Sequence, residues 1–300
     1  DYPRLAWEGR PGVVLPALSL GDSLSGKGTQ AEPYLIESAD QFNLIGLYPC
    51  EWDKCFRLMA DIELSGYPAG EHNVIGVNYQ AAFQGIFDGN GHTLSDLTIT
   101  GTGHLGVFGH LADKAEVRNL GVVNVNITSR NSHNGSLVGQ NRGIVTNCYS
   151  AGSINCYSAD PIGLGAGGIA GLVGENTGTV TQCYSTGVVS GRGSLAGLVG
   201  YNSGVVTYCY SAVRISGTGE STVLGGLVGS GEAAINSFWD IQTSGQTTSA
   251  GGHGRSTEQM QRASTYRGWN TCGQAAWTIE DGQDYPRLAW EGRPGVVLPA

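Results

Sequence analysis

Four fifteen-residue blocks in the middle of the chain repeat one pattern without gaps. In each block a second anchor residue follows the first apolar residue at a distance of eleven positions, whereas the spacing between blocks varies. A constant block joined by variable connectors predicts a solenoid whose coils stack on their neighbours. The blocks are SLVGQNRGIVTNCYS (136–150), GLVGENTGTVTQCYS (171–185), GLVGYNSGVVTYCYS (197–211) and GLVGSGEAAINSFWD (226–240).

Two diverged blocks precede these four, and together they predict six coils with two or three more on the N-terminal side. GIFDGNGHTLSDLTI (85–99) fits without gaps, with Ile86 and Leu97 at the anchor positions, and GVFGHLADKAEVRNL (106–120) fits with an insertion. Short runs of β-branched and aromatic residues between glycines favour β-strands over helices. Glycine contributes 49 of the 300 residues, and its tolerance of positive φ suits the corners of a solenoid.

Equivalent positions in stacked coils should form columns of like side chains, and neighbours along a strand should point to opposite faces. The expected columns are Leu137, Leu172, Leu198 and Leu227; Cys148, Cys183, Cys209 and Phe238; Tyr149, Tyr184, Tyr210 and Trp239; and, at a turn, Asn90, Asn141, Asn176 and Asn202. The third of these, the aromatic column, is a candidate surface for binding sugar rings or another rod, unless loops or a second sheet cover it.

The first seventeen residues, DYPRLAWEGRPGVVLPA, recur identically as residues 284–300. This duplication predicts one full period of a longer tandem array together with the tail of the preceding copy. Residues 1–9 would then be the second strand of a hairpin whose first strand belongs to the preceding copy, so we expect 1–7 to be loosely held. The expected divisions are 1–17, tail of the preceding unit; 18–32, linker; 33–80, N-terminal cap and first coils; 81–245, coils; 246–283, C-terminal cap; and 284–300, start of the next junction.

Both caps should contain short helices, because the open end of a solenoid exposes unpaired strand edges. Ser38 is a plausible N-cap for a helix that covers the first coil. Ser256 and Gln259 form a capping box for a helix that ends near Gly268. Two strands around the turn EDGQ then predict a hairpin.

The G-L-V-G blocks, the turn DGNGHT (88–93), GTQAEPYLIESADQFNLI (28–45) and FRLMADIELSGY (56–67) resemble the GLUG-motif proteins of bacteria and archaea. The resemblance covers about residues 25–290 and implies an all-β, right-handed parallel β-helix. It also implies an exported, extracellular or cell-surface protein of adhesin-like or filament-like type. No enzymatic activity attaches to the motif.

An exported protein would permit disulfides, and Cys50 and Cys55 are close enough in sequence to close a small loop. Relatives with this motif often lack the second of these cysteines, so Cys50 with Cys272 is the competing pair. Because those two residues should lie at opposite ends of the rod, that bond would join consecutive units head to tail. Cys148, Cys183 and Cys209 are expected to be buried free thiols, because a straight column of sulfurs does not suit tetrahedral metal binding.

Evidence for other chemistry is weak. His253 lies in a GHG triplet, but between residues 135 and 229 the blocks hold a single acidic residue, Glu175, placed in a turn, whereas glycoside hydrolysis needs two carboxylates. Asp88, Asn90 and Asp96 are better explained by a DGNG turn than by calcium. The net charge of −9 and scattered basic residues exclude a nucleic-acid partner. The sequence contains no run of 18 apolar residues, so it predicts no membrane span.

These patterns predict a non-catalytic module, without metal or cofactor, that repeats along a surface or extracellular fibre and binds neighbouring copies of itself head to tail. An adhesin or carbohydrate-binding module is the alternative, with surface glycans contacting the aromatic column or the connector at 151–168. A polysaccharide-active enzyme is the third possibility.

Overall fold

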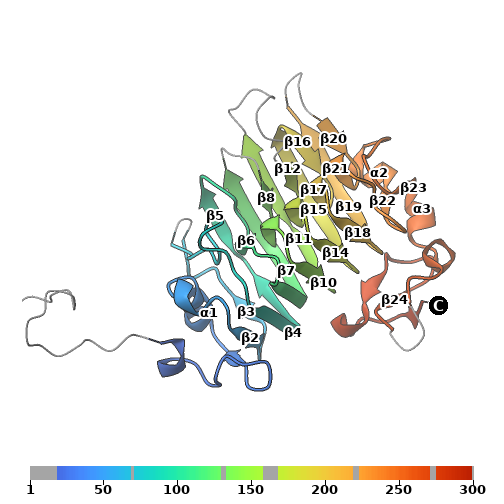
Figure 1. Cartoon of the computed structure of the whole chain (residues 1–300). Helices are drawn as coiled ribbons and strands as arrows, with labels where there is room; N and C mark the ends of the chain where they lie inside the picture. Colours follow the sequence, from blue (N-terminus) through green and yellow to red (C-terminus); the bar gives the residue numbers. More distant parts are fainter. Residues whose placement is uncertain are drawn as a thin grey trace, which may run out of the picture.

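The chain folds mainly into β-strands that stack in parallel as a solenoid of about six turns. Figure 1 shows the strands of successive coils side by side. The computed structural model describes residues 19–68, 71–129, 133–157, 168–218, 223–270 and 275–298. Successive coils in the sequence lie side by side along the stack, as their change of colour in Figure 1 shows. The predicted parallel β-solenoid is therefore confirmed. The expectation of a loosely held segment at residues 1–7 lies outside the described residues.

The N-terminal part contains the first coils and a helical cap. Helix α1 begins directly after Ser38, whose side chain accepts from the backbone N–H of Gln41, so the predicted N-cap is confirmed. The elements are η2 (Leu20–Asp22), β1 (Tyr34–Ile36), α1 (Ala39–Ile45), η3 (Pro49–Glu51), β2 (Cys55–Leu58), β3 (Ile62–Glu63), β4 (Ile86–Ser95), β5 (Thr98–Gly101), β6 (Phe108–Leu111) and β7 (Glu116–Ser129).

Each regular coil contains four short strands joined by corners. The first consists of β8 (Asn134–Gly135), β9 (Val138–Asn141), β10 (Ile144–Thr146) and β11 (Tyr149–Tyr157). The next two consist of β12 (Gly168–Ala170), β13 (Val173–Asn176), β14 (Thr179–Thr181) and β15 (Tyr184–Arg192), and of β16 (Ser194–Ala196), β17 (Val199–Asn202), β18 (Val205–Thr207) and β19 (Tyr210–Gly217). The last contains β20 (Val223–Gly225), β21 (Val228–Gly231) and β22 (Phe238–Asp240).

Three parallel sheets make up the stack. The largest runs from the first coils to the last, in the order β1-β2-β4-β7-β11-β15-β19-β22-β23, where β23 is His253–Arg255. The other two span fewer coils and follow β20-β16-β12-β8 and β21-β17-β13-β9-β6. Leu172 and Leu198 are direct neighbours, since the N–H of Leu172 donates to the carbonyl of Leu198 at 3.2 Å. Both side chains are fully buried. The leucine column is therefore present as predicted.

The asparagine column is present in three of its four expected positions. Asn141 donates its side-chain amide to Asn176, and Asn176 donates to Asn202, each at 2.8 Å. Asn90 does not belong to this column, contrary to the prediction. It occupies a corner with φ near +53°, the conformation that Asn119 adopts in the next coil. The reason is register, because Ile86 pairs with Glu116 and lies level with Ile144 rather than with Leu137.

The last coil is also out of the predicted register, by one residue. Tyr210 pairs with Phe238, and Ser211 pairs with Trp239. Ser237 therefore takes the place that the prediction gave to Phe238, and its hydroxyl donates to the carbonyl of Ile235 as the thiol of Cys209 donates to that of Thr207. The cause is a corner one residue shorter than in the preceding coil, since Val228 pairs with Val199 but Ile235 bridges Thr207.

The interior is filled differently at its two ends. Aromatic rings fill the N-terminal coils, where Phe56, Phe87 and Phe108 are fully or almost fully buried and Phe87 packs edge-on to Phe108. At the other end Trp239, which is 6% exposed, packs with the solenoid core and donates its indole N–H to the carbonyl of Gln246. The equivalent inward position in the preceding coil holds the small side chain of Ser211. The much larger indole of Trp239 therefore fills the end of the interior.

Residues 19–32, predicted as part of a linker, belong to the N-terminal cap. Ser19 and Asp22 form a capping box around η2, and Ser19 donates to Glu51 at 2.9 Å. Leu20 and Leu24 are buried in the main core. Leu20 and Leu24 thus anchor this segment at the end of the solenoid.

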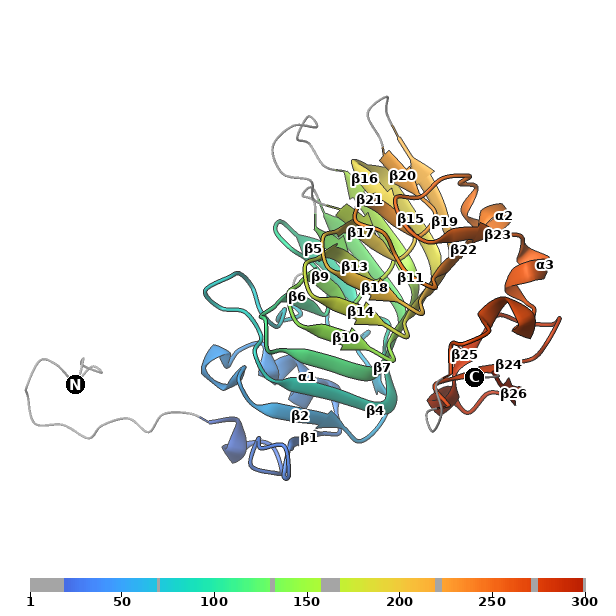
Figure 2. The same cartoon turned by 45° about the vertical axis from the view of Figure 1, so that its right-hand side comes forward.

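The C-terminal part confirms the capping box and the hairpin but not the length of the helix. Ser256 and Gln259 cap a helix that ends at Met260, and a short 3-10 turn follows. Figure 2 shows β24, β25 and β26 as a small antiparallel sheet outside the stack of coils. The elements are α2 (Ile241–Ser244), β23 (His253–Arg255), α3 (Thr257–Met260), η4 (Ala263–Tyr266), β24 (Trp277–Ile279), β25 (Arg287–Leu288), η5 (Ala289–Glu291) and β26 (Val296–Val297).

Candidate functional site: a covered tyrosine column

Three tyrosines form a stacked column on the outer face of the largest sheet. Tyr149 pairs with Tyr184, and Tyr184 pairs with Tyr210, so the backbone register places their side chains above one another. The ring centroids are 4.9 Å apart in both pairs, and the rings are nearly parallel, at 4° and 1°. This spacing matches the distance between adjacent strands. We call these three residues the tyrosine column.

Trp239 does not continue the column, so this part of the prediction is wrong. The one-residue shift of the last coil turns its indole into the solenoid and places Phe238 beside Tyr210. Residues that alternate along a strand point to opposite faces, so a slip of one residue exchanges the inner and outer sets.

The column is buried, so of the two alternatives left open by the sequence the covered column is correct and the exposed aromatic surface is wrong. Tyr184 and Tyr210 have no exposed area, and Tyr149 is half-buried. A second hydrophobic core covers them, separate from the interior of the solenoid. It consists chiefly of Tyr184, Tyr210, Phe238, Met260, Tyr266, Trp269, Trp277, Ile279, Leu288 and Leu298. The covering residues come from the C-terminal part, including the second copy of the repeated heptadecamer.

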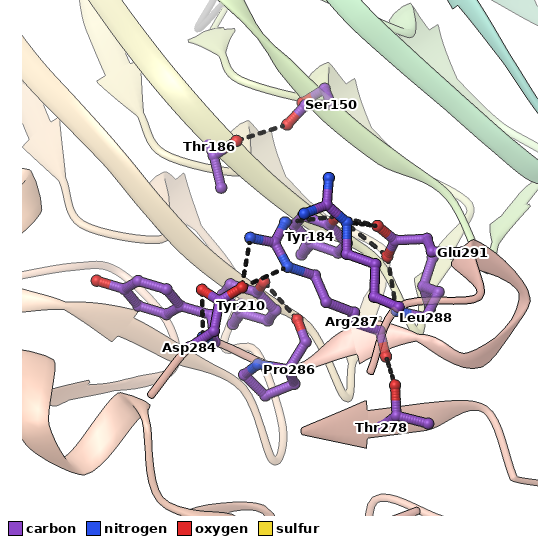
Figure 3. A network of polar contacts seen from close by, with 12 residues as sticks. Ser150, Tyr184, Thr186, Tyr210, Thr278, Asp284, Pro286, Arg287, Leu288 and Glu291 are labelled. Carbon is purple, nitrogen blue, oxygen red and sulfur yellow. Dashed lines mark hydrogen bonds and ion pairs between the residues drawn. The ribbon is translucent and has the colours of Figure 1, made fainter. Parts of the chain in front are cut away.

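Arg287 and Glu291 converge on the hydroxyl of Tyr184, as Figure 3 shows. The guanidinium of Arg287 donates to this oxygen at 3.1 Å, and the hydroxyl donates to the Glu291 carboxylate at 3.0 Å. Arg287 also forms an ion pair with Asp284 at 3.0 Å and lies over the Tyr184 ring. The carboxylate of Glu291 accepts the backbone N–H of Leu288, which fixes the turn that follows β25. We call residues 284–298 the closing segment.

The other two tyrosines are held by the same segment. The hydroxyl of Tyr210 donates to the carbonyl of Pro286 at 2.7 Å. Trp290 stacks on Tyr149 with ring centroids 5.6 Å apart, and its indole N–H donates to the carbonyl of Asn147 at 3.1 Å. Each tyrosine thus contacts a different residue of the closing segment, and the segment runs along the whole column.

Burial controls the charge state of this interface. Burial raises the pKa of Tyr149 to about 12 and raises the pKa values of Tyr184 and Tyr210 further, so all three are neutral at physiological pH. Burial also raises the pKa of Glu291, against the opposing effect of its hydrogen bonds and of Arg287. For Arg287 burial opposes the charged form, but the neighbouring tyrosine oxygens and Asp284 outweigh it and raise its pKa.

Cys50 and Cys55 are both free in the structure, the first exposed and the second half-buried in β2. The predicted bond between them is therefore not formed here. The competing pairing with Cys272 lies outside the described residues. Cys148, Cys183 and Cys209 are buried free thiols, as predicted. Among the described residues, no group of three or more His, Cys, Asp or Glu side chains is placed to hold a metal ion.

A histidine cluster that the sequence did not predict lies beside the five-stranded sheet that contains β6, β9 and β13. The rings of His104 and His110 are hydrogen-bonded, and the ring of His133 lies 4.4 Å from that of His104. The Nε2 atom of His133 lies 2.7 Å from a carboxylate oxygen of Glu175. Burial lowers the pKa of His104 to about 4. Glu175, predicted in a turn, is thus a residue of strand β13 with a structural partner.

The remaining candidates have ordinary structural roles or are isolated. Asp88 is paired with Arg118 at 3.2 Å and with Arg57, which leaves the DGNG turn with a charge-balanced carboxylate. His253 is exposed on β23 near Phe238. A surface cavity of about 320 Å³ adjoins the histidine cluster. Its lining includes Tyr79, His110 and Arg142.

Two known proteins are similar in sequence to part of this chain. No family model matches the chain. Halomucin of Haloquadratum walsbyi is 31% identical over 138 residues, which cover 43% of this chain and 2% of that protein. A protein of Evansella cellulosilytica, provisionally named a Gly-rich membrane protein, is 34% identical over 129 residues, which cover 41% of this chain and 15% of that protein. The aligned regions therefore span a small part of both relatives.

One solved structure has a similar fold. It is a Bacteroides ovatus protein provisionally described as an immunoglobulin A1 protease, with a TM-score of 0.63 over 88% of this chain and 94% of that chain. The sequences are 18% identical, so the likeness shows the fold alone. In the part of the chain that the structure describes, no helix is long and apolar enough to cross a bilayer.

Proposed function

We propose that this chain is a non-catalytic structural module that repeats along an extracellular or cell-surface fibre. The observation that carries the proposal is the closing segment, whose sequence occurs identically at residues 1–15 and which packs along the tyrosine column of three consecutive coils. A segment that completes one unit and also precedes the next suits a tandem array. Continuous side-chain columns would supply stiffness along the axis.

The partial relatives support a surface location. Similarity to a halomucin and to a provisionally named membrane protein fits a protein outside the cytoplasm, and membership of the GLUG-motif family is part of the same proposal. Immunogold labelling of native cells and culture medium tests it. We expect label along filaments or at the cell surface, and label confined to the cytoplasm would contradict the proposal.

A catalytic role is the competing class, and the name of the structural neighbour supplies a direct assay. We expect immunoglobulin A1 and acidic polysaccharides to stay intact after long incubation with the purified chain. Cleavage that persists through chromatography of the protein would refute the non-catalytic assignment.

A glycan-binding module is the second candidate. The cavity beside Tyr79 is a better candidate for its binding surface than the tyrosine column, because the column is buried. Tyr79 is 57% exposed, and its ring has the guanidinium of Arg142 5.7 Å away. An exposed tyrosine offers a large apolar ring face together with a polar hydroxyl, which suits a contact surface. A glycan-array signal lost in Tyr79→Ala but kept in Tyr201→Ala would favour this candidate.

A further inference from the structure

The tyrosine column is a binding site with two identical sequences available to fill it. Residues 284–298 occupy it in the structure, and residues 1–15 carry the same side chains at an offset of 283 positions. We propose that residues 1–17 bind the tyrosine column of a second copy of this chain. The inference deepens the function proposed above, on which it rests, by naming the surface that joins copies.

The contacts of the closing segment depend on side chains, so they define what the site recognises. Arg287, Trp290 and Glu291 provide the bonds to Tyr184 and to Asn147. Their counterparts are Arg4, Trp7 and Glu8. Tyrosine, tryptophan and arginine are the residue types that most often dominate binding energy at protein interfaces.

The site also supplies a strand that the repeated sequence lacks. β24 pairs with β25 through Trp277 and Leu288 and with β26 through Thr278 and Val297. Within this chain, β24 precedes only the C-terminal copy. Residues 1–17 can therefore complete the same small antiparallel sheet only with the β24 of a tyrosine column that they bind.

Chain length directs residues 1–17 to a different molecule. The counterpart of Leu15 is Leu298, whose N–H donates to the carbonyl of Trp277, and Trp277 packs against Tyr184 in β15. Ser19 is bonded to Glu51 at the N-terminal cap, level with β1. The sheet order places β15 five strands from β1, a distance of about 24 Å at about 4.8 Å per strand. Four residues from Leu15 to Ser19 span at most about 14 Å.

The attached closing segment competes strongly, because covalent linkage gives it an effective concentration on the order of millimolar. Exchange between molecules should therefore become visible once this segment is weakened. The test uses the full chain with Arg287→Ala, Trp290→Ala and Glu291→Ala, here called the C-copy variant. The N-copy variant carries Arg4→Ala, Trp7→Ala and Glu8→Ala, and the double-copy variant carries all six changes.

Light scattering coupled to size exclusion is the measurement. We expect the C-copy variant to rise at least about twofold in weight-average mass in the high-micromolar range, because residues 1–17 of one molecule fill the vacated column of the next. The parent, the N-copy variant and the double-copy variant should each keep the same weight-average mass at every concentration. Equal masses of the C-copy and double-copy variants at every concentration would overturn the proposal.

Loss of folding in the C-copy variant is a foreseeable complication, and a milder pair of variants addresses it. Trp290→Ala removes one anchor at the end of the column, and its matched control adds Trp7→Ala. Circular dichroism checks that both variants are folded, and their weight-average masses are then compared. Oligomers of Trp290→Ala that do not form when Trp7→Ala is added support the proposal. Identical masses of the two variants reject it. Labelling of native filaments tests the array separately, so a surface fibre whose purified chains never exchange would overturn this inference alone.

Discussion

Asn176 donates its side-chain amide to the side-chain oxygen of Asn202 at 2.8 Å while its own side-chain oxygen accepts from Asn141. All three residues are fully buried at the corner between two sheets. The ladder therefore links three coils through one continuous chain of amides, and each amide satisfies the next.

We expect Asn176→Ala to reduce the free energy of unfolding by about 2–4 kcal/mol, because it removes two buried amide–amide hydrogen bonds. The Asn141 amide then keeps only the carbonyl of Thr179 as its acceptor, and the Asn202 oxygen keeps only the N–H of Gly204 as its donor. Asn126→Ala, at an exposed position of β7, should change it by less than about 0.5 kcal/mol. Urea unfolding followed by circular dichroism measures both. Similar losses in the two variants would argue against the ladder.

The inward orientation of Trp239 predicts a specific clash at Gly226. A Cβ on Gly226 would lie 2.1 Å from the indole, so Gly226→Ala should destabilise the parent. Trp239→Ala removes the indole and should cost about 3–5 kcal/mol, since it empties the end of the core. In the Trp239→Ala background the Gly226→Ala change should cost far less. Additive losses in this double-mutant cycle would mean that the indole points elsewhere.

The cysteine column should tolerate serine. Ser237 already fills the fourth position and donates to a carbonyl two residues earlier, as the thiols do. Cys183→Ser is therefore expected to cost less than about 1.5 kcal/mol, whereas Cys183→Leu should cost more because the column has no spare volume. Thermal unfolding of the two variants decides the order, and the reverse order would refute this account.

Thiol accessibility gives an independent check on the same column. Alkylation of the native chain should label Cys50 quickly and Cys148, Cys183 and Cys209 only after unfolding, because burial excludes the reagent and raises the pKa of the Cys183 thiol. Peptide mass spectrometry identifies each site. Rapid native labelling of Cys183 would contradict its burial.

Acid should destabilise the N-terminal cap through His72. Both ring nitrogens are buried without hydrogen-bond partners, and burial lowers the pKa to about 4. The unfolded chain, with a pKa near 6.5, binds the proton first, so stability is complete above about pH 6.5 and declines as the pH falls toward 4. This one group accounts for about 3 kcal/mol of the decline.

His72→Phe should reduce the slope of that part of the profile, because a phenyl ring can take the stacked position against Phe42 without a titrating group. A smaller slope should remain, since burial also lowers the pKa values of His104 and His110. His253→Phe, at an exposed position, should leave the profile unchanged. Urea unfolding at several pH values measures the slopes. A slope that is unchanged in His72→Phe would assign the acid sensitivity to other groups.

The repeating part of the fold was predictable because identical spacing leads to identical stacking. The column of Leu137, Leu172, Leu198 and Leu227 could be read directly from the blocks, and so could the Ser38 and Ser256 caps. The one-residue shift in the last coil could not be recognised from residue type. Phe238 is apolar like Cys209, with which it was expected to align, and Trp239 is aromatic like Tyr210. The shortened corner and the hydroxyl of Ser237 were the available signals.

The covering of the tyrosine column could not be predicted from local pattern. Arg287 reaches Tyr184 across 103 positions of sequence, and no periodic signal joins the two. The histidine cluster was missed for a similar reason. His104 and His133 lie in connectors outside the repeated blocks, and only the stacking of coils brings them together with Glu175.

Buried leucines at the two ends of the described chain limit how freely successive solenoids could swing. Leu298 and Leu20 are each anchored in a core. Where a sequence like residues 18–24 follows Ala300, only four residues lie between these anchors, and five extended steps span about 17 Å. One of the four is a proline, whose fixed φ removes further freedom. Adjacent solenoids tethered this closely would bend together as one filament without a hinge. A pulling force on one solenoid would therefore be transmitted to the next.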